Sequence, residues 1–169
     1  MTPPKATMWT SFFGSIRRNR GKDDILNFIS TVPLFDSLSK RELDTIHSIA
    51  HHRIYREDEF IFRKGQPGAA MFLIKSGSVN IVDQDQDNLT NILTTLQSNT
   101  FFGELALLDD SPRSASAIAA KTTETFAFFR TDLDRLLNSF PQIGLKVYRA
   151  LAMIIGDRLK ETNEQLLNK

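Results

Sequence analysis

The chain lacks several features that define common classes of protein. It has no cysteine in 169 residues, which excludes disulfide frameworks, thiol nucleophiles and cysteine zinc sites and suits a reducing compartment. No apolar run reaches the roughly 18–20 residues of a membrane-spanning helix, and the N-terminus has no secretory signal pattern. Basic and acidic residues nearly balance, at 21 and 20, which argues against a generic nucleic-acid-binding protein. We therefore expect a cytoplasmic protein with one globular domain.

Motifs for catalysis and metal binding are also missing. The sequence has no Gly-x-Ser-x-Gly elbow, P-loop or Gly-x-Gly-x-x-Gly motif. His47 and His51 have the i, i+4 spacing of a zinc site, but no glutamate lies between them, so surface histidines at a helix end are favoured. Residues 83–88 resemble the start of a calcium loop, but Asn88 replaces its glycine and Thr94 its glutamate, which favours a polar hairpin tip. We expect neither a metal nor enzymatic activity.

The near-neutral charge conceals a basic N-terminal segment, residues 1–24. Residues 1–22 carry five basic residues and no acid, so the rest of the chain, with 16 basic and 20 acidic residues, has a net charge of −4. Aromatic and apolar side chains in this segment share a helical spacing: Trp9, Phe12, Phe13 and Ile16. Such a segment suits an anionic membrane surface or a partner's groove. We favour the alternative, in which it packs on its own domain or on a dimer mate.

Short helices are predicted before a region rich in strands. A helix from about Ile25 ends near Val32, because a proline follows, and a capping box at Ser39 starts a second helix. From Ile54 to Phe129, runs rich in β-branched and aromatic residues alternate with turn residues, which predicts a β sandwich or barrel. The predicted strands include Glu59–Arg63, Ala70–Lys75, Ser78–Val82, Asn91–Leu96 and Thr125–Phe129.

Helices are predicted again at the C-terminus. Asp132–Ser139 forms a short helix, and a longer one follows Pro141 to about Leu167. Along one side the longer helix carries apolar residues close to a heptad seam: Val147, Leu151, Ile154 or Ile155, Leu159 and Leu166. The seam either pairs with its copy in a homodimer or packs on its own β domain, and different parts of the helix can do each.

One segment, residues 101–116, suggests a binding site. Gly103 permits close backbone approach, and the apolar residues after it can form one helical turn whose free amides suit an anion. Glu104 precedes Arg113 by nine residues, and the arginine fork matches phosphate oxygens. A carboxylate and a guanidinium here can hold a sugar hydroxyl and a phosphate, or they can form a salt bridge over a turn.

The segment resembles the phosphate-binding cassette of the cyclic nucleotide-binding domain family, which includes catabolite activator proteins and protein kinase regulatory subunits. That cassette reads Phe-Gly-Glu-Leu-(Ala/Gly)-Leu and then Pro-Arg-(Ser/Thr/Ala)-Ala. The resemblance extends to residues 32–35 and 72–79 and covers about residues 25–165. It implies an α+β fold, an eight-stranded antiparallel β roll like a jelly roll, flanked by N-terminal helices and a long C-terminal helix. The expected divisions are the leader 1–24, the β-roll domain 25–140 and the C-terminal helix 141–169.

The resemblance also assigns ligand contacts. Glu104 would accept a hydrogen bond from the ribose hydroxyl, and Arg113 would pair with the cyclic phosphate. The remaining implied contacts are Gly103, Leu105 and Ala106 through their amides, Ser114 and Ala115 beside the phosphate or base, Ile81, Thr94 and Leu96 on strands of the pocket, and Thr162 and Asn163 on the long helix. In the family a hydroxyl after the arginine can favour guanine, yet it occurs in adenine-binding activators, and we favour cAMP over cGMP.

The function implied is that of a sensor. A cyclic nucleotide would reposition the C-terminal helix toward an unknown effector protein or a dimer mate. Activator proteins continue into a helix-turn-helix domain that this chain does not contain, so we expect no nucleic acid as partner. The alternative is a ligand-free interaction module of the same fold, tethered to a membrane or a partner by its N-terminal segment.

Overall fold

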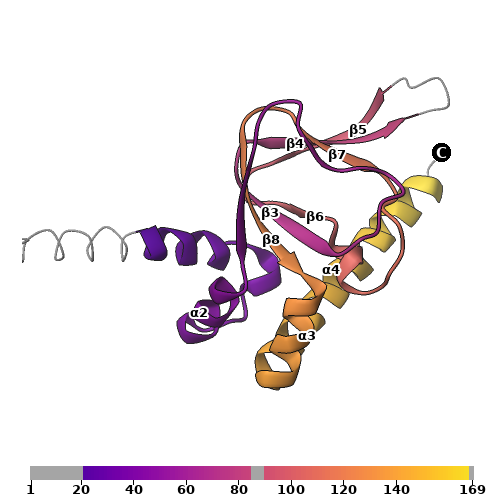
Figure 1. Cartoon of the computed structure of the whole chain (residues 1–169). Helices are drawn as coiled ribbons and strands as arrows, with labels where there is room; N and C mark the ends of the chain where they lie inside the picture. Colours follow the sequence, from indigo (N-terminus) through magenta and orange to yellow (C-terminus); the bar gives the residue numbers. More distant parts are fainter. Residues whose placement is uncertain (1–20, 85–89, 168–169) are drawn as a thin grey trace, which may run out of the picture.

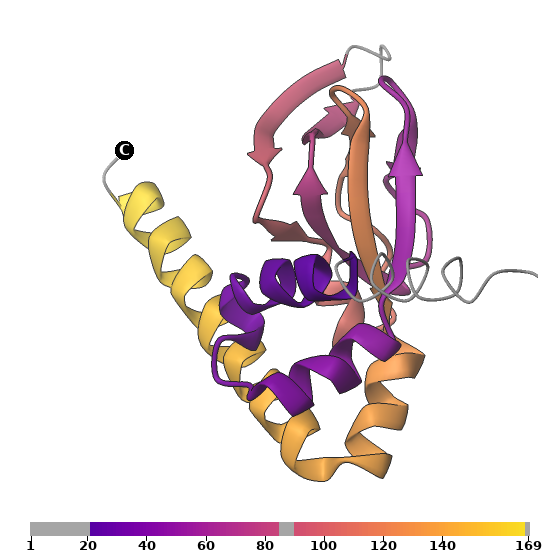
Figure 2. The ribbon, with the colours of Figure 1, turned by 90° about the vertical axis from the view of Figure 1, so that its left-hand side faces the viewer.

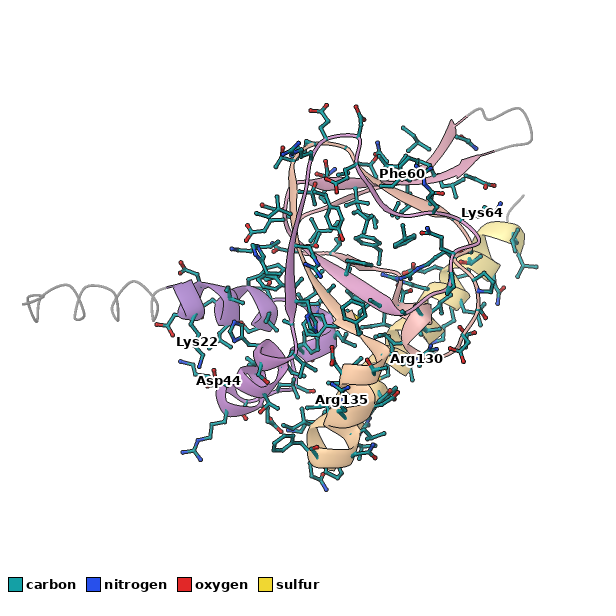
Figure 3. All side chains as sticks on the ribbon, in the orientation of Figure 1. Lys22, Asp44, Phe60, Lys64, Arg130 and Arg135 are labelled. Atoms are coloured by element: carbon teal, nitrogen blue, oxygen red, sulfur yellow. The ribbon has the colours of Figure 1, made fainter. Side chains whose placement is uncertain are left out.

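The computed structural model describes residues 21–84 and 90–167, in which a β roll rests on a group of helices (Figures 1 and 2). The aromatic residues of the leader lie outside the described residues. Residues 21–30 are helical, and the short 3-10 helix η1 (Pro33–Phe35) follows at the proline that was expected to end that helix. Lys22 in the first of these turns forms an ion pair with Asp44 at 2.8 Å (Figure 3).

Eight strands form two antiparallel sheets, which confirms the predicted fold class. One sheet has the order β1-β8-β3-β6 and the other β2-β7-β4-β5. The strands are β1 (His51–Tyr55), β2 (Phe60–Phe62), β3 (Ala70–Ser76), β4 (Ser78–Gln84), β5 (Thr90–Gln97), β6 (Phe101–Phe102), β7 (Ser116–Ala119) and β8 (Thr123–Phe129). The β4–β5 hairpin brackets the predicted polar tip, most of which lies outside the described residues.

The central strand β3 is apolar on both faces because it separates two cores. Met71 and Leu73 belong to the cluster that the sheet shares with the helices. Phe72 and Ile74 belong to the smaller cluster inside the roll, together with Phe102. Side chains alternate between the faces of a strand, so a continuous apolar run serves both layers.

The helix α2 (Lys40–Ser48) begins with the predicted capping box. The Ser39 amide donates to Glu42 Oε2 at 2.7 Å, and the Glu42 amide donates to Ser39 Oγ at 3.4 Å. Glu42 also accepts from Lys146 Nζ, at 2.8 and 3.0 Å to its two oxygens. These contacts lower the pKa of Glu42 to about 2. The capping residue thus fastens α2 to the long C-terminal helix.

Of the two histidines predicted at a helix end, His47 lies in the last turn of α2, whereas the placement of His51 was wrong. The helix ends at Ser48, and His51 and His52 lie on β1, a strand that starts earlier than predicted. His51 Nε2 lies 2.8 Å from Asp132 Oδ2, and His52 Nε2 lies 2.8 Å from Glu124 Oε1. The residues of β1 are largely exposed at the sheet edge. The strand therefore lacks the apolar pattern from which the other strands were predicted.

Two helices close the fold: α3 (Arg130–Ser139) and α4 (Pro141–Leu167). Val147 and Leu151 of α4 are buried in the helical core, whereas Leu159 and Leu166 are exposed. Figure 2 shows the last turns of α4 projecting beside the roll. Within residues 21–84 and 90–167, no helix combines the length and apolar character needed to cross a bilayer.

Candidate functional site

The segment after β6 brings the backbone close to an arginine. Gly103 has φ 72°, in the left-handed region that glycine adopts readily, and it begins the 3-10 helix η2 (Glu104–Leu107). A Cβ atom on Gly103 would lie 2.7 Å from Arg113 Nη1, so a side chain here would displace the guanidinium. The amide of Ala106 donates to Gly103 O at 3.2 Å, which engages one of the amides predicted to be free.

Arg113 is held by backbone groups from distant parts of the chain. Its Nη2 donates to Ala70 O at 2.6 Å and its Nη1 to Gly103 O at 3.2 Å. The Nε atom is buried and has no hydrogen-bond partner among the described residues. Burial lowers the pKa of Arg113, which the charge of Glu104 opposes, and an arginine remains a cation after such a shift. The site thus contains a half-buried cation whose Nε–H has no partner among the described residues.

Glu104 is the second charged group of the site, and it is only 8% exposed. Its Oε1 accepts a hydrogen bond from Nη1 of Arg158, which lies on α4. The Arg158 guanidinium also lies over the Phe101 ring, 4.8 Å from its centroid, and Nη2 is 3.5 Å from Phe101 O. The expected alternative of a Glu104–Arg113 salt bridge is wrong, because the ion pair that Glu104 forms is with Arg158.

Both charged groups face a cavity of about 540 Å³. Ten of the twelve predicted residues line it: Ile81, Thr94, Leu96, Gly103, Glu104, Leu105, Ala106, Arg113, Ser114 and Ala115. Thr162 and Asn163 do not line it and are exposed on the last turns of α4, where Thr162 Oγ1 donates to Arg158 O at 2.8 Å. The structure therefore gathers the cassette and the strand residues but not these two helix residues.

Sequence reasoning missed other lining residues, among them Phe62, Asp109 and Arg158. Arg158 precedes Thr162 by one helical turn, so the i, i+4 rule applied to the predicted helix would have placed both on one face. No comparable signal marks Phe62, because β2 is only three residues long and its place beside the cavity depends on sheet packing.

The cassette is also attached to the start of α3. Arg130 donates through Nη1 to the carbonyl of Asp109 and through Nη2 to the carboxylate of Asp110. Arg130 lies where the roll meets α3 (Figure 3). Asp109 accepts from the Ser111 hydroxyl at 2.7 Å and the Ser111 amide at 3.1 Å, and these bonds lower the pKa of Asp109.

The geometry suits a ligand that carries both an anion and a hydroxyl group. A half-buried guanidinium favours a phosphate, and a buried carboxylate accepts from a hydroxyl donor. The cavity volume falls in the range of small-molecule sites. Among the described residues, no group of three histidine or acidic side chains is placed to hold a metal ion.

Known proteins are similar to this chain in sequence. The profile of the cyclic nucleotide-binding domain matches residues 52–140. A cyclic AMP receptor protein of Thermus thermophilus is 34% identical over 134 residues, 79% of this chain and 60% of the receptor. A cyclic nucleotide-gated potassium channel of Rhizobium etli is 32% identical over 137 residues, 80% of this chain and 36% of the channel.

A solved structure shows the same architecture. The cyclic nucleotide-binding domain from Methylobacillus flagellatus has a TM-score of 0.74 and 26% identity, over 86% of this chain and 82% of that domain. The chain spans less than two thirds of the receptor and of the channel. The profile match covers more than half of the chain and includes the whole cassette, so the chain belongs to the cyclic nucleotide-binding domain family.

Proposed function

We propose that this chain is a regulatory sensor that binds cAMP in preference to cGMP and signals by repositioning α4. The observation that carries the proposal is the half-buried Arg113 guanidinium, whose buried Nε has no partner among the described residues, in one cavity with the buried carboxylate of Glu104. An unpaired buried donor is costly and is explained by a ligand that accepts from it. The cyclic phosphate would accept from Arg113, and the ribose hydroxyl would donate to Glu104.

Two observations support the preference for cAMP. The strand residues that would face the base include the apolar Ile81 and Leu96, which contact a purine ring without pairing with guanine's exocyclic groups. The receptor that is 34% identical is named for cyclic AMP, whereas cGMP-dependent protein kinases of Caenorhabditis briggsae and Plasmodium berghei are 31% and 24% identical. Ser114 supplies a hydroxyl at the cavity that is compatible with either nucleotide.

The proposed signal passes through Glu104. Arg158 uses Oε1 of this carboxylate, and a carboxylate has a second oxygen that can accept from a ribose hydroxyl. A nucleotide would then fix Glu104, and Glu104 would fix Arg158 and the end of α4. Ligand binding would in this way shift α4 toward one position among those it already samples.

We further propose that α4 pairs with a second copy of the chain. Leu145, Ala152, Leu159 and Leu166 recur every seven residues and are exposed, as expected for a coiled-coil seam without its partner. Light scattering after size exclusion would test this, with a Leu159→Glu variant expected to shift a dimer toward monomer. A monomeric wild-type protein at 100 μM or so, well above typical dimer dissociation constants, would contradict the pairing.

The central test is the response of the protein to cAMP and cGMP measured side by side. Binding to the native state must raise its melting temperature, and calorimetry gives both dissociation constants. Arg113→Ala should weaken cAMP binding by about 3–5 kcal/mol, because the buried phosphate loses its charge partner. Arg63→Ala is the matched control, since Arg63 is exposed and does not line the cavity. Unchanged cAMP affinity in the Arg113 variant would contradict the phosphate role.

A second candidate is a ligand-free interaction module of the same fold. The observation that favours it is that Glu104 already has an arginine partner within the chain, so the carboxylate is not left unpaired. The measurements with cAMP and cGMP separate the two candidates. A ligand-free module requires that neither nucleotide raises the melting temperature. Co-sedimentation with anionic vesicles, with and without residues 1–22, tests whether the N-terminal segment tethers it.

A further inference from the structure

An aromatic ring lies directly against the guanidinium that is proposed to bind phosphate. The Arg113 Cζ atom is 4.1 Å from the centroid of the Phe62 ring, within the range of a cation–π contact. Phe62 lies on β2 and is partly buried, and it lines the same cavity as Arg113. The ring therefore covers one side of the guanidinium at the wall of the site.

The Phe62 ring is itself fixed by a cluster of three aromatic side chains. Its centroid is 5.9 Å from that of Phe72 and 5.8 Å from that of Phe102. The Phe72 and Phe102 rings are stacked, with centroids 5.4 Å apart and an interplanar angle of 17°. These residues come from β2, β3 and β6, so the cluster joins the two sheets beneath Arg113. Because contacts with the other sheet fix the Phe62 ring, the ring can restrain the Arg113 guanidinium that lies against it.

We propose that Phe62 is a positioning residue that presents Arg113 to an anionic phosphodiester, an inference that rests on the proposed function. The ring face and the carbonyls of Ala70 and Gly103 restrain the guanidinium, and the two carbonyls use a donor on each terminal nitrogen. Nε is the guanidinium nitrogen that has no hydrogen-bond partner among the described residues. Because the restraints exist before binding, the ligand need not order a flexible arginine.

The same strand offers a matched control for the ring. The Arg63 Cζ lies 3.4 Å from the centroid of the Phe60 ring, so Phe60 is also stacked with an arginine. Phe60 is partly buried like Phe62 but does not line the cavity, and it lies on the upper part of the roll (Figure 3). Phe60→Leu and Phe62→Leu thus remove the same kind of stack, outside and inside the site.

The test combines nucleotide affinity with the state of the ligand-free arginine. Phe62→Leu should weaken cAMP binding about tenfold, whereas Phe60→Leu should leave it within about twofold. Phe62→Tyr keeps the ring face and should recover most of the affinity. In an Arg113→Gln background, Phe62→Leu should change the affinity by less than about twofold, because the cation through which it acts is gone.

The ligand-free readout is the Nε–H resonance of Arg113 in ¹H–¹⁵N spectra, identified by its loss in Arg113→Gln. A ring above the guanidinium shifts this proton upfield, so Phe62→Leu should move the resonance downfield and Phe60→Leu should not. Thermal melts confirm that each variant is folded before it is titrated.

The outcomes separate the inference from the proposed function. If wild-type protein binds cAMP and Phe62→Leu changes neither the affinity nor the Arg113 resonance, the positioning role is overturned. A tenfold loss that persists in the Arg113→Gln background also overturns it, because Phe62 then contacts the ligand directly. If wild-type protein binds neither nucleotide, the proposed function fails together with the ligand role, while the resonance still reports whether Phe62 restrains Arg113.

Discussion

The two halves of α4 are attached to the protein by different means. The first half places Ile143, Val147 and Leu151 in the helical core, and Lys146 binds Glu42. Beyond residue 156 the helix is exposed, and Arg158 attaches it to the cavity through Glu104. Lys160 and Thr162 make their side-chain hydrogen bonds within the helix itself.

This difference indicates how the first half of α4 can stabilise the fold while the second half changes position. Apolar burial does not depend on a ligand, so the first half should keep its place in every state. An ion pair at the cavity can be strengthened or replaced by a ligand, so the second half is the part that a nucleotide can control. The following predictions test this contrast in order of expected effect.

The largest effect is expected from truncating the buried half. Leu151 is fully buried, and Leu151→Ala should lower the free energy of unfolding by about 2–5 kcal/mol through lost burial and a cavity. Leu159→Ala is the matched control in the exposed half, and for a monomer it should change stability by less than about 0.5 kcal/mol. Urea unfolding measures both changes. Similar losses of stability in the two variants would contradict the difference between the buried and exposed halves of α4.

An intermediate effect is expected from removing the attachment at the cavity. Arg158→Ala should weaken cAMP binding by about 1 kcal/mol, because Glu104 loses the partner that orients it and the pair is partly exposed. It should also free the end of α4. Arg149→Ala, an exposed arginine in the first half, should leave the affinity unchanged.

Spin labels can report the position of that end. The chain has no cysteine, so labels at cysteines introduced at the exposed residues Ser98 and Glu161 would be unique. We expect cAMP to narrow the distance distribution in the native background and Arg158→Ala to broaden it without ligand. If neither cAMP nor Arg158→Ala changes the distance distribution, the cavity does not control the position of α4.

The smallest effect concerns the pH dependence of the first half. The pKa of Glu42 is about 2 in the folded state against an ordinary value of 4.5, so its ion pair stabilises the protein fully above pH 4.5. This contribution is lost as the pH falls from 4.5 toward 2. Because the pair is partly exposed, we expect it to amount to about 0.5–1 kcal/mol.

Unfolding by urea at pH 6 and pH 3 tests this assignment. Lys146→Met should reduce the loss of stability between the two pH values, because the lysine makes the largest contribution to the shift. Lys121→Met changes an exposed lysine elsewhere and should leave that loss unchanged. If both variants lose stability equally between pH 6 and pH 3, Lys146 is not the group that lowers the pKa of Glu42.

The predictable parts of the fold were those with a local signal. The apolar run of β3, the capping box at Ser39 and the proline that begins α4 each lie within a few residues, and each was found from the sequence. The start of β1 was predicted too late, near Ile54, because its exposed first residues at the sheet edge have no apolar pattern. His51 was placed at the end of a helix for the same reason.

The cassette could be predicted from local sequence: a glycine that tolerates a positive φ, a carboxylate beside it and an arginine nine residues later. The surroundings of these groups depend on tertiary packing. Arg158 reaches Glu104 across 54 residues of sequence, and Phe62 reaches Arg113 from β2, which pairs with the strand β7 that follows Arg113. Propensity and spacing act between near neighbours, whereas these contacts depend on how the sheets and helices pack, which no short pattern encodes.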